Sequence, residues 1–262
     1  MKITTIQTHL YWEDREKNLK HFDGLIDAIA EPTDLIVLPE MFSTGFSMNP
    51  GKTAEAHLGD TFQWLQKKAK EKNAVITGSV AIKEGNKYYN RLHWISPDGS
   101  YDFYDKRHLF RMAKEDEVYV AGTKKIIKEV KGFNVLPLVC YDLRFPIWSR
   151  NGFDPAANKW DYDVLIYVAN WPEVRNYPWK QLLIARAIEN QCYVVGLNRI
   201  GKDGNGFDHS GDSVVLNPRG EIISKTPAHQ ETIETTEIDL NYLEEFRKVF
   251  PVGLDSDRFE LK

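Results

Sequence analysis

The amino-acid sequence predicts a single α/β domain built from two similar halves. Three observations carry this prediction. The 262 residues are enough for one large domain, and 42% of them are hydrophobic, so a sizeable core can form. Short apolar strands alternate with amphipathic helices. The order of these elements in the first half of the chain then recurs in the second half. Long disordered regions are therefore excluded for most of the chain.

The first half of the chain contains three strands, two helices and a hairpin, expected in this order: a strand over 3–10, a helix over 15–29, a strand over 34–38, a helix beginning at Asp60, a strand over 74–82 and a hairpin over 88–105. The helices are predicted from apolar residues that recur on one face. Pro39 ends the strand 34–38 and leaves Glu40 just beyond it. The turn Pro97-Asp98-Gly99 is typical of a hairpin.

The second half repeats this order: a strand over 163–168, a helix over 179–191 with Pro178 in its first turn, a strand over 192–197 and a hairpin over 213–224. Because no Gly/Ser-rich linker separates the halves, we expect one domain over residues 1–240. Its two sheets should pack on each other with helices outside.

The segment 241–262 differs from the rest of the chain. Its apolar residues predict a short helix ended at Pro251, followed by a polar extension. Phe250 and Phe259 project beyond the last expected strand. Such a tail either docks on a partner subunit or frays.

Charge and hydropathy exclude several kinds of partner. The chain has 34 basic and 38 acidic side chains, and no basic cluster longer than Lys106-Arg107, which argues against nucleic acid. No stretch approaches the length of a membrane span, and the first residues lack the apolar region of a signal peptide. Two cysteines are too few for a disulfide framework, so we expect a cytoplasmic protein with reduced thiols.

Motifs for metals and nucleotides are missing as well. The seven histidines form neither H-x-H nor H-E-x-x-H, so no metal site is expected. The glycines around Asn205 lack the third glycine of a dinucleotide-binding loop, and no phosphate-binding loop occurs. The sequence predicts no cofactor.

Cys140 is a candidate nucleophile. It ends the apolar run 135–139, and Pro146 suits the first turn of a following helix. At such a strand-to-helix turn, backbone N–H groups and the positive helix end would favour a thiolate. A buried core cysteine is the alternative. Cys192 enters an apolar strand with no polar neighbour, and we expect it to be structural.

A cysteine nucleophile needs a base and a group that stabilises the oxyanion. Glu40 stands at a strand end among aromatic residues, where a raised pKa would let it shuttle protons. Lys106 follows the strand 101–105 and could supply a fixed positive charge. A solvated loop glutamate and a solvated lysine are the alternatives. All three candidates lie at strand ends, where α/β sheets build their sites.

Four segments that surround these residues resemble the carbon-nitrogen hydrolase (nitrilase) superfamily, over nearly the whole chain up to about residue 240. They are Leu38-Pro39-Glu40-Met41-Phe42, residues 104–110, residues 140–146 and residues 186–191. Each alone is weak evidence, but four in the family's order are specific. The resemblance implies a four-layer αββα sandwich, which agrees with the two predicted halves, and pairing into a homodimer.

The resemblance also implies the catalytic residues. The family's Glu-Lys-Cys triad falls on Glu40, Lys106 and Cys140, and its second glutamate falls on Glu115, seven residues before Gly122. In the implied mechanism, the glutamate of the triad takes the thiol proton as sulfur attacks an amide carbon. The lysine and the backbone N–H of Tyr141 then stabilise the oxyanion. The second glutamate orients either the lysine or the substrate amide.

Within the superfamily, the sequence is most similar to the omega-amidase branch, on residues 167–172 and the segment around Cys140. This similarity implies that water hydrolyses the terminal amide of 2-oxoglutaramate or 2-oxosuccinamate through a thioester, without a cofactor. A nitrilase or an N-carbamoyl amide hydrolase is the alternative inside the superfamily. A non-catalytic binding module, or a Cys-His hydrolase using His108 or His209, is the alternative outside it.

A 2-oxo acid amide carries a carboxylate at the end opposite its amide. Arg144, four residues after Cys140, is the candidate cation, because an arginine can bind a carboxylate through two parallel hydrogen bonds. Trp171 would form the apolar wall along the carbon chain. Pairing of Arg144 with Asp142 or another structural carboxylate is the alternative.

Overall fold

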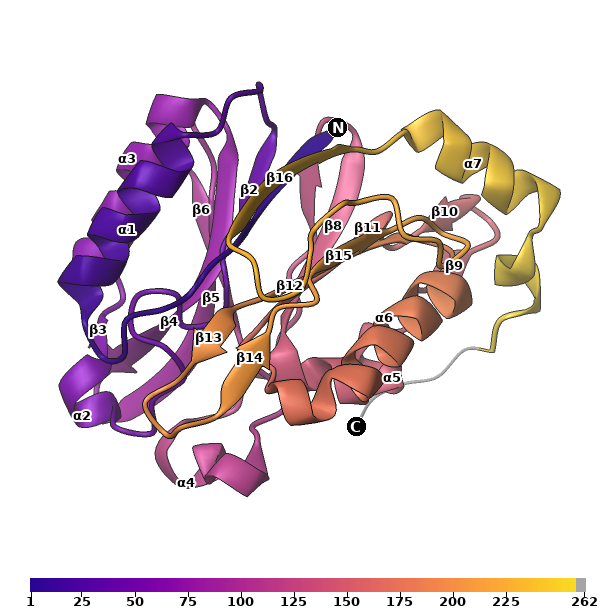
Figure 1. Cartoon of the computed structure of the whole chain (residues 1–262). Coiled ribbons are helices and arrows are strands. Elements are labelled where there is room, and N and C mark those ends of the chain that lie inside the picture. Colours follow the sequence, from indigo (N-terminus) through magenta and orange to yellow (C-terminus); the bar gives the residue numbers. More distant parts are fainter. Residues whose placement is uncertain (258–262) are drawn as a thin grey trace.

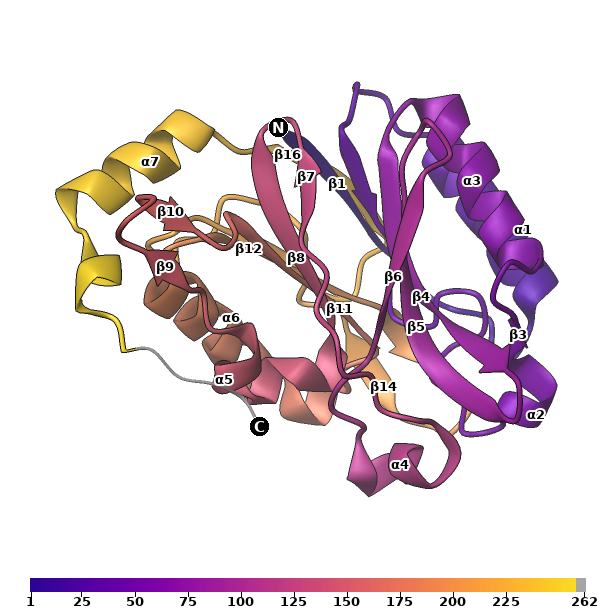
Figure 2. The same cartoon turned by 180° about the vertical axis from the view of Figure 1, so that it is seen from behind.

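The computed structural model describes residues 1–257, which form four layers. Two β-sheets pack face to face, and helices cover the outer face of each sheet (Figures 1 and 2). Helices α1 (Arg15–Asp27) and α3 (Asp60–Lys72) cover the first sheet, and α5 (Pro146–Ser149) and α6 (Asn176–Asn190) cover the second. The predicted αββα sandwich is confirmed.

The first sheet has the strand order β16-β1-β2-β4-β5-β6, with β3 paired to β4 off this path. Strands β1, β2 and β4 run parallel, and β5, β6 and β16 are antiparallel to their neighbours. The strands are β1 (Lys2–Gln7), β2 (Leu35–Val37), β3 (Glu55–Ala56), β4 (Val75–Glu84), β5 (Lys87–Ile95), β6 (Tyr101–Asp105) and β16 (Thr232–Glu237).

The second sheet has the order β15-β12-β11-β8-β7, with parallel strands in the centre and antiparallel strands at both edges. Its strands are β7 (Lys128–Val130), β8 (Phe133–Val139), β11 (Val164–Ala169), β12 (Tyr193–Asn198) and β15 (Val214–Leu216). Every residue of β11 and β12 is buried, because both faces of this sheet are covered.

The remaining elements are short and connect or flank the layers. Two ribbons pair β9 (Phe153–Asp154) with β10 (Lys159–Trp160) and β13 (Ile200–Lys202) with β14 (Asp208–Ser210). The other helices are α2 (Pro50–Thr53), α4 (Glu115–Val118), α7 (Leu240–Val249) and the 3₁₀ turns η1 (Arg111–Ala113), η2 (Cys140–Arg144), η3 (Glu173–Arg175) and η4 (Val252–Asp255). Within residues 1–257, no helix combines the length and apolarity needed to cross a membrane.

Local sequence explains where the main helices begin and how closely they pack. The Asp14 side chain accepts a hydrogen bond from the Lys17 N–H and caps α1. Pro178 lies in the first turn of α6, where its missing N–H leaves no hydrogen bond unmade. At Gly196, a Cβ atom would lie 2.4 Å from the Leu183 side chain, so glycine allows α6 to pack directly on β12.

The predicted similarity of the two halves extends to the hairpin expected over 213–224, which is present in shortened form. The turn at 217–220 forms, Leu216 and Ile222 form an antiparallel bridge, and the Ile223 N–H donates a hydrogen bond to the Val215 carbonyl (2.9 Å). The chain then crosses to the first sheet, where β16 pairs with β1 along its whole length (Figure 1).

The C-terminal segment forms the expected helix, α7, and packs on its own domain. Leu243 is fully buried. The buried Arg247 guanidinium donates hydrogen bonds to the Asp163 carboxylate (2.6 Å) and to the carbonyls of Tyr162 and Gln191. Phe250 is exposed, and Phe259 lies outside the described residues.

Candidate active site

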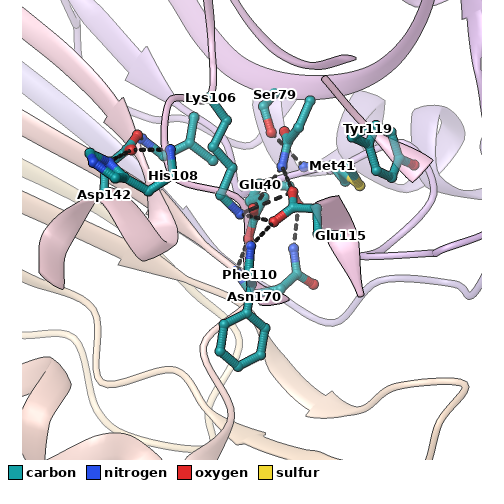
Figure 3. Close-up of polar contacts among 12 residues, drawn as sticks. Glu40, Met41, Ser79, Lys106, His108, Phe110, Glu115, Tyr119, Asp142 and Asn170 are labelled. Carbon is teal, nitrogen blue, oxygen red and sulfur yellow. Dashed lines mark hydrogen bonds and ion pairs between the residues drawn. The ribbon is translucent and has the colours of Figure 1, made fainter. Parts of the chain in front are cut away.

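Three strand ends bring Glu40, Lys106 and Cys140 together, as the sequence predicts. Glu40 follows β2, Lys106 follows β6 and Cys140 follows β8, so both sheets contribute. The side chains of Glu40 and Lys106 are fully buried, and Cys140 is 8% exposed. Figure 3 shows the buried polar network that surrounds Lys106.

The Lys106 ammonium lies between two carboxylates (Figure 3). Its Nζ is 2.8 Å from Glu40 Oε1 and 2.9 Å from Glu115 Oε2. Burial by itself lowers the pKa of Lys106, but the charges of Glu115 and Glu40 more than offset burial and hold the pKa above its ordinary value. The lysine is therefore a permanent cation in the site.

The turn after β2 fixes Glu40. The Ser79 hydroxyl accepts a hydrogen bond from the N–H of Met41, which has a left-handed backbone with φ of 42°. The Glu40 carboxylate accepts hydrogen bonds from the Asn90 amide at Oε1 and from the Asn170 backbone N–H at Oε2, each 2.8 Å long. These contacts orient the carboxylate from two sides.

Glu115 is the first residue of α4 and is fully buried. It accepts hydrogen bonds from the Phe110 N–H (2.6 Å) and the Asn90 amide (3.1 Å), in addition to those from Lys106. Burial raises the pKa of the Glu115 carboxyl, Lys106 opposes this, and Glu40 raises the pKa further. Asn90 thus bridges the two carboxylates with one amide nitrogen.

Cys140 begins η2 with a left-handed backbone, φ of 45°, which is unfavourable for a residue with a side chain. Burial raises the pKa of its thiol well above the ordinary value. The Glu40 charge, and a hydrogen bond to Glu40, raise the pKa further against the opposing effect of Lys106. The expectation that this turn favours a thiolate is therefore wrong for the free enzyme. The reason is that a short 3₁₀ turn, and not the helix α5, follows Cys140, and desolvation exceeds what such a turn can offer.

Cys140 lies at a cavity of about 690 Å³. The predicted substrate-binding residues Tyr141, Arg144 and Trp171 line the same cavity. Glu40, Lys106 and Glu115 are not among its lining residues and lie behind the thiol. Further lining residues are Phe46, Met48, Phe110, Asn170, Arg175 and His209. The cavity is therefore largely apolar and aromatic, and its charged lining residues are two arginines and Asp203.

Arg144 is exposed and has no ion pair within residues 1–257. Its guanidinium lies 5.2 Å from the centre of the Trp171 ring. The alternative pairing with Asp142 is wrong, because that carboxylate accepts hydrogen bonds from the Tyr104 hydroxyl (2.8 Å) and the His108 N–H (3.0 Å). Asp142 also lies 2.7 Å from His108 Nδ1 (Figure 3).

Neither candidate histidine contacts the Cys140 sulfur among the described residues. His108 stacks on Phe145, with ring centres 3.8 Å apart, and pairs with Asp142. Burial lowers the pKa of His209 to about 4, and its Nδ1 lies beside backbone carbonyls. Glu40 is the carboxylate whose charge most strongly raises the pKa of the thiol, and neither histidine contributes to it, which disfavours a Cys-His hydrolase.

Cys192 lies in different surroundings. It is fully buried in the main hydrophobic core, and burial raises the pKa of its thiol. It does not line the cavity that Cys140 lines.

The sequence analysis missed Asn90, Asn170 and Asp142, which hold the site in place. The available signal for Asn90 was an amide side chain in the middle of an expected strand. Asn90 is fully buried in β5, which pairs with a strand on each side, so its side chain needs polar partners inside the protein. Asn170 and Asp142 follow strand ends of the second sheet, at the same edge as Cys140.

Comparisons with known proteins agree with this geometry. Residues 2–248 match the carbon-nitrogen hydrolase family. The chain is 49% identical to Omega-amidase YafV of Escherichia coli (strain K12), over 100% of this chain and 98% of that protein. It is 33% identical to 2-oxoglutaramate amidase of Bacillus subtilis (strain 168), over 95% of each.

A solved structure of the same superfamily has a closely similar fold. The protein XC1258 from Xanthomonas campestris, described as a CN-hydrolase superfamily protein with an arsenic adduct in the active site, matches with a TM-score of 0.96. It is 42% identical, over 100% of this chain and 99% of that chain. The fold, the buried site and these relatives lead to one conclusion: the chain belongs to the carbon-nitrogen hydrolase family and is an amidase that hydrolyses non-peptide C–N bonds.

Proposed function

We propose that the protein is an omega-amidase, which hydrolyses the terminal amide of 2-oxoglutaramate or 2-oxosuccinamate to a 2-oxo dicarboxylate and ammonia. One observation carries this proposal: the thiol of Cys140, backed by Glu40 and Lys106, shares its cavity with the unpaired guanidinium of Arg144. The relatives named as an omega-amidase and a 2-oxoglutaramate amidase support the same substrate class.

The first half of the reaction forms a thioester. The Glu40 carboxylate takes the thiol proton while the Cys140 sulfur attacks the amide carbon, so the raised thiol pKa is overcome only as the bond forms. The Lys106 ammonium and the Tyr141 backbone N–H stabilise the tetrahedral oxyanion, each donor being worth roughly 2.7–4 kcal/mol. Protonated Glu40 then gives its proton to the departing nitrogen, the C–N bond breaks and ammonia leaves.

The second half consumes the thioester. Glu40, again ionised, takes a proton from a water molecule whose oxygen attacks the thioester carbon. The C–S bond breaks, the product leaves as a carboxylic acid that ionises, and the proton on Glu40 returns to the Cys140 sulfur. Glu115 acts as a positioning residue, because it holds the Lys106 ammonium with both carboxylate oxygens.

The other end of the substrate is held by Arg144 and Trp171. An arginine that has no protein carboxylate to pair with can bind the substrate carboxylate through two parallel hydrogen bonds. The Trp171 ring beneath the guanidinium limits where this group can lie and offers apolar surface to the carbon chain. A short chain between amide and carboxylate would then fix the amide at the sulfur.

A homodimer and a cytoplasmic location complete the proposal. The outer layer formed by α5 and α6 exposes the large apolar side chains of Ile147, Tyr177 and Ile188, which supports contact with a second copy. Both cysteines are unpaired and buried, as expected for a protein kept in a reducing compartment.

The test is ammonia release from a panel of 2-oxo acid amides, neutral short amides, nitriles and N-carbamoyl compounds. We expect the 2-oxo acid amides to have the highest kcat/KM. Cys140→Ala should abolish turnover, and the matched variant Cys192→Ala should retain most of it. Iodoacetamide should inactivate the enzyme with the label on Cys140. A faster reaction with nitriles or carbamoyl compounds would establish the alternative inside the superfamily.

A further inference from the structure

A second cluster of reactive side chains lies away from the catalytic site. It consists of His9, which follows β1, His21, which belongs to α1, and Glu231, which immediately precedes β16. None of the three lines the catalytic cavity. One nitrogen from each imidazole and one carboxylate oxygen all lie within 4.8 Å of one another.

The distances within the cluster suit a metal ion. Oxygen Oε2 of Glu231 is 3.0 Å from His21 Nε2 and 3.4 Å from His9 Nδ1. Zinc bonds to nitrogen and oxygen are about 2.0–2.1 Å long, and a tetrahedral arrangement places neighbouring ligand atoms about 3.3–3.4 Å apart. The two distances to Glu231 are thus close to those of a tetrahedral site, and the third pair of ligand atoms lies within 4.8 Å.

The surroundings also suit a metal. The buried Thr8 hydroxyl donates a hydrogen bond to Glu231 Oε2 and lies 2.8 Å from His21 Nε2, so it holds two of the ligand atoms next to each other. The side chains of His9 and Glu231 are about 40% exposed, which leaves a path for an ion and a water ligand. Arg199 is the positive group that opposes a cation here.

We propose that His9, His21 and Glu231 bind a divalent transition-metal ion of the zinc type. Two imidazoles and one carboxylate favour zinc and its neighbours over magnesium, which prefers oxygen ligands. The fourth position is left to water. No local sequence motif indicates such a site, because His21 and Glu231 are 210 residues apart in the sequence and His9 and His21 have no standard metal-ligand spacing. The ion would join the end of β1, the helix α1 and the segment that leads into β16.

Metal binding is measured on the full chain carrying Cys140→Ala, so that the thiol at the cavity does not capture the ion. Cobalt(II) is titrated while its visible absorption is recorded, and thermal unfolding is followed with and without zinc(II). We expect one cobalt per chain. At a zinc concentration about 100 times the Kd, we expect the Tm to rise by about 5 °C. Magnesium should leave the Tm unchanged.

Two ligand variants and one control decide the assignment. His9→Ala and Glu231→Gln should each weaken binding more than about 10-fold, since even loss of an outer-shell partner costs 10–100-fold. His229→Ala removes an exposed histidine of the same segment and should bind like the parent. The Tm of each variant in EDTA reports folding. No zinc-dependent rise in Tm, or equal binding by all variants, would overturn the proposal.

Discussion

Replacing Glu40 with glutamine tests the central step of the proposed mechanism. The substitution keeps the shape of the side chain but removes its charge and its ability to take a proton. The Asn170 backbone N–H can still donate to the new amide oxygen, but the amide nitrogen then faces the Asn90 amide and the Lys106 ammonium, so a local rearrangement is expected on that side. Cys140 and Lys106 themselves are unchanged.

The expected loss of activity in Glu40→Gln follows from the ionisation of the Cys140 thiol. Burial holds the pKa of Cys140 above its ordinary value. At pH 7, an ordinary cysteine thiol with a pKa of about 8.5 is ionised to roughly 3%. The raised pKa of Cys140 makes its ionised fraction smaller still, so losing the base costs about 30-fold or more in the attack step. Loss of proton transfer to the departing ammonia adds to this, since general acid–base catalysis contributes 10²–10⁴-fold. We expect kcat to fall by about 10³-fold or more.

Turnover of the Glu40→Gln variant should increase with pH. Without Glu40, turnover should depend on the ionised fraction of the thiol and rise about tenfold per pH unit between about pH 7 and 8. The Glu40 charge itself raises the pKa of Cys140, so the variant should show a lower thiol pKa than the wild type. The wild-type enzyme should show no such rise, because its base supplies the thiolate.

The assay combines ammonia release from pH 6 to 9 with the rate at which iodoacetamide labels Cys140, followed by mass spectrometry. Glu115→Gln is the matched control, because it removes an equal charge from the same network but affects the thiol pKa least. A loss below tenfold, or a thiol pKa that rises in Glu40→Gln, would refute the role of Glu40 as the base.

Four further variants test other parts of the site and the fold. Arg144→Lys should reduce kcat/KM for 2-oxoglutaramate about tenfold more than for a neutral short amide; equal losses would make the arginine structural. Lys106→Met should abolish turnover and lower the free energy of unfolding, measured in urea, by about 3–5 kcal/mol, because two buried carboxylates lose their cation. The destabilisation should be larger at pH 8 than at pH 5, since protonation removes the carboxylate charges. Gly122→Ala should lower the stability measured by thermal unfolding by about 1–3 kcal/mol, because its Cβ would lie 2.0 Å from the Asp105 backbone oxygen. The control Gly24→Ala should not destabilise the protein, because no atom lies within 4 Å of its Cβ position. Ile147→Lys should convert a dimer into a monomer by light scattering, and a monomeric wild type would contradict the proposed interface.

The sequence predicts that Glu40, Lys106 and Cys140 meet, because each follows an expected strand and strand ends meet at the edge of a sheet. Strand ends alone leave a solvated glutamate and a solvated lysine as alternatives. The four segments that resemble the carbon-nitrogen hydrolase superfamily are what single out these three residues. The protonation state of the Cys140 thiol could not be predicted from strand ends. It depends on how deeply the packed sheets bury the sulfur and on the carboxylate that faces it.

Two features needed the three-dimensional structure. Asn90 bonds both catalytic carboxylates, but its partners come from other segments of the chain, and nothing local indicates them. Strand β16 has the sequence Thr-Ile-Glu-Thr-Thr-Glu, which lacks a clear alternation of apolar and polar residues. Its place in the sheet depends on pairing with β1, including contact between the hydroxyls of Thr4 and Thr235.

The pairing of β16 with β1 has a consequence for synthesis on the ribosome. The first sheet begins with the first strand to be made, but its last strand emerges only after both sheets and most helices have been translated. Until then, one edge of β1 carries unpaired backbone groups that can pair with another nascent chain. Contacts of such long sequence separation also slow folding. A chain interrupted before residue 232 would keep Glu40, Lys106 and Cys140 and still present an open sheet edge, so aggregation is expected to precede any loss of the site itself.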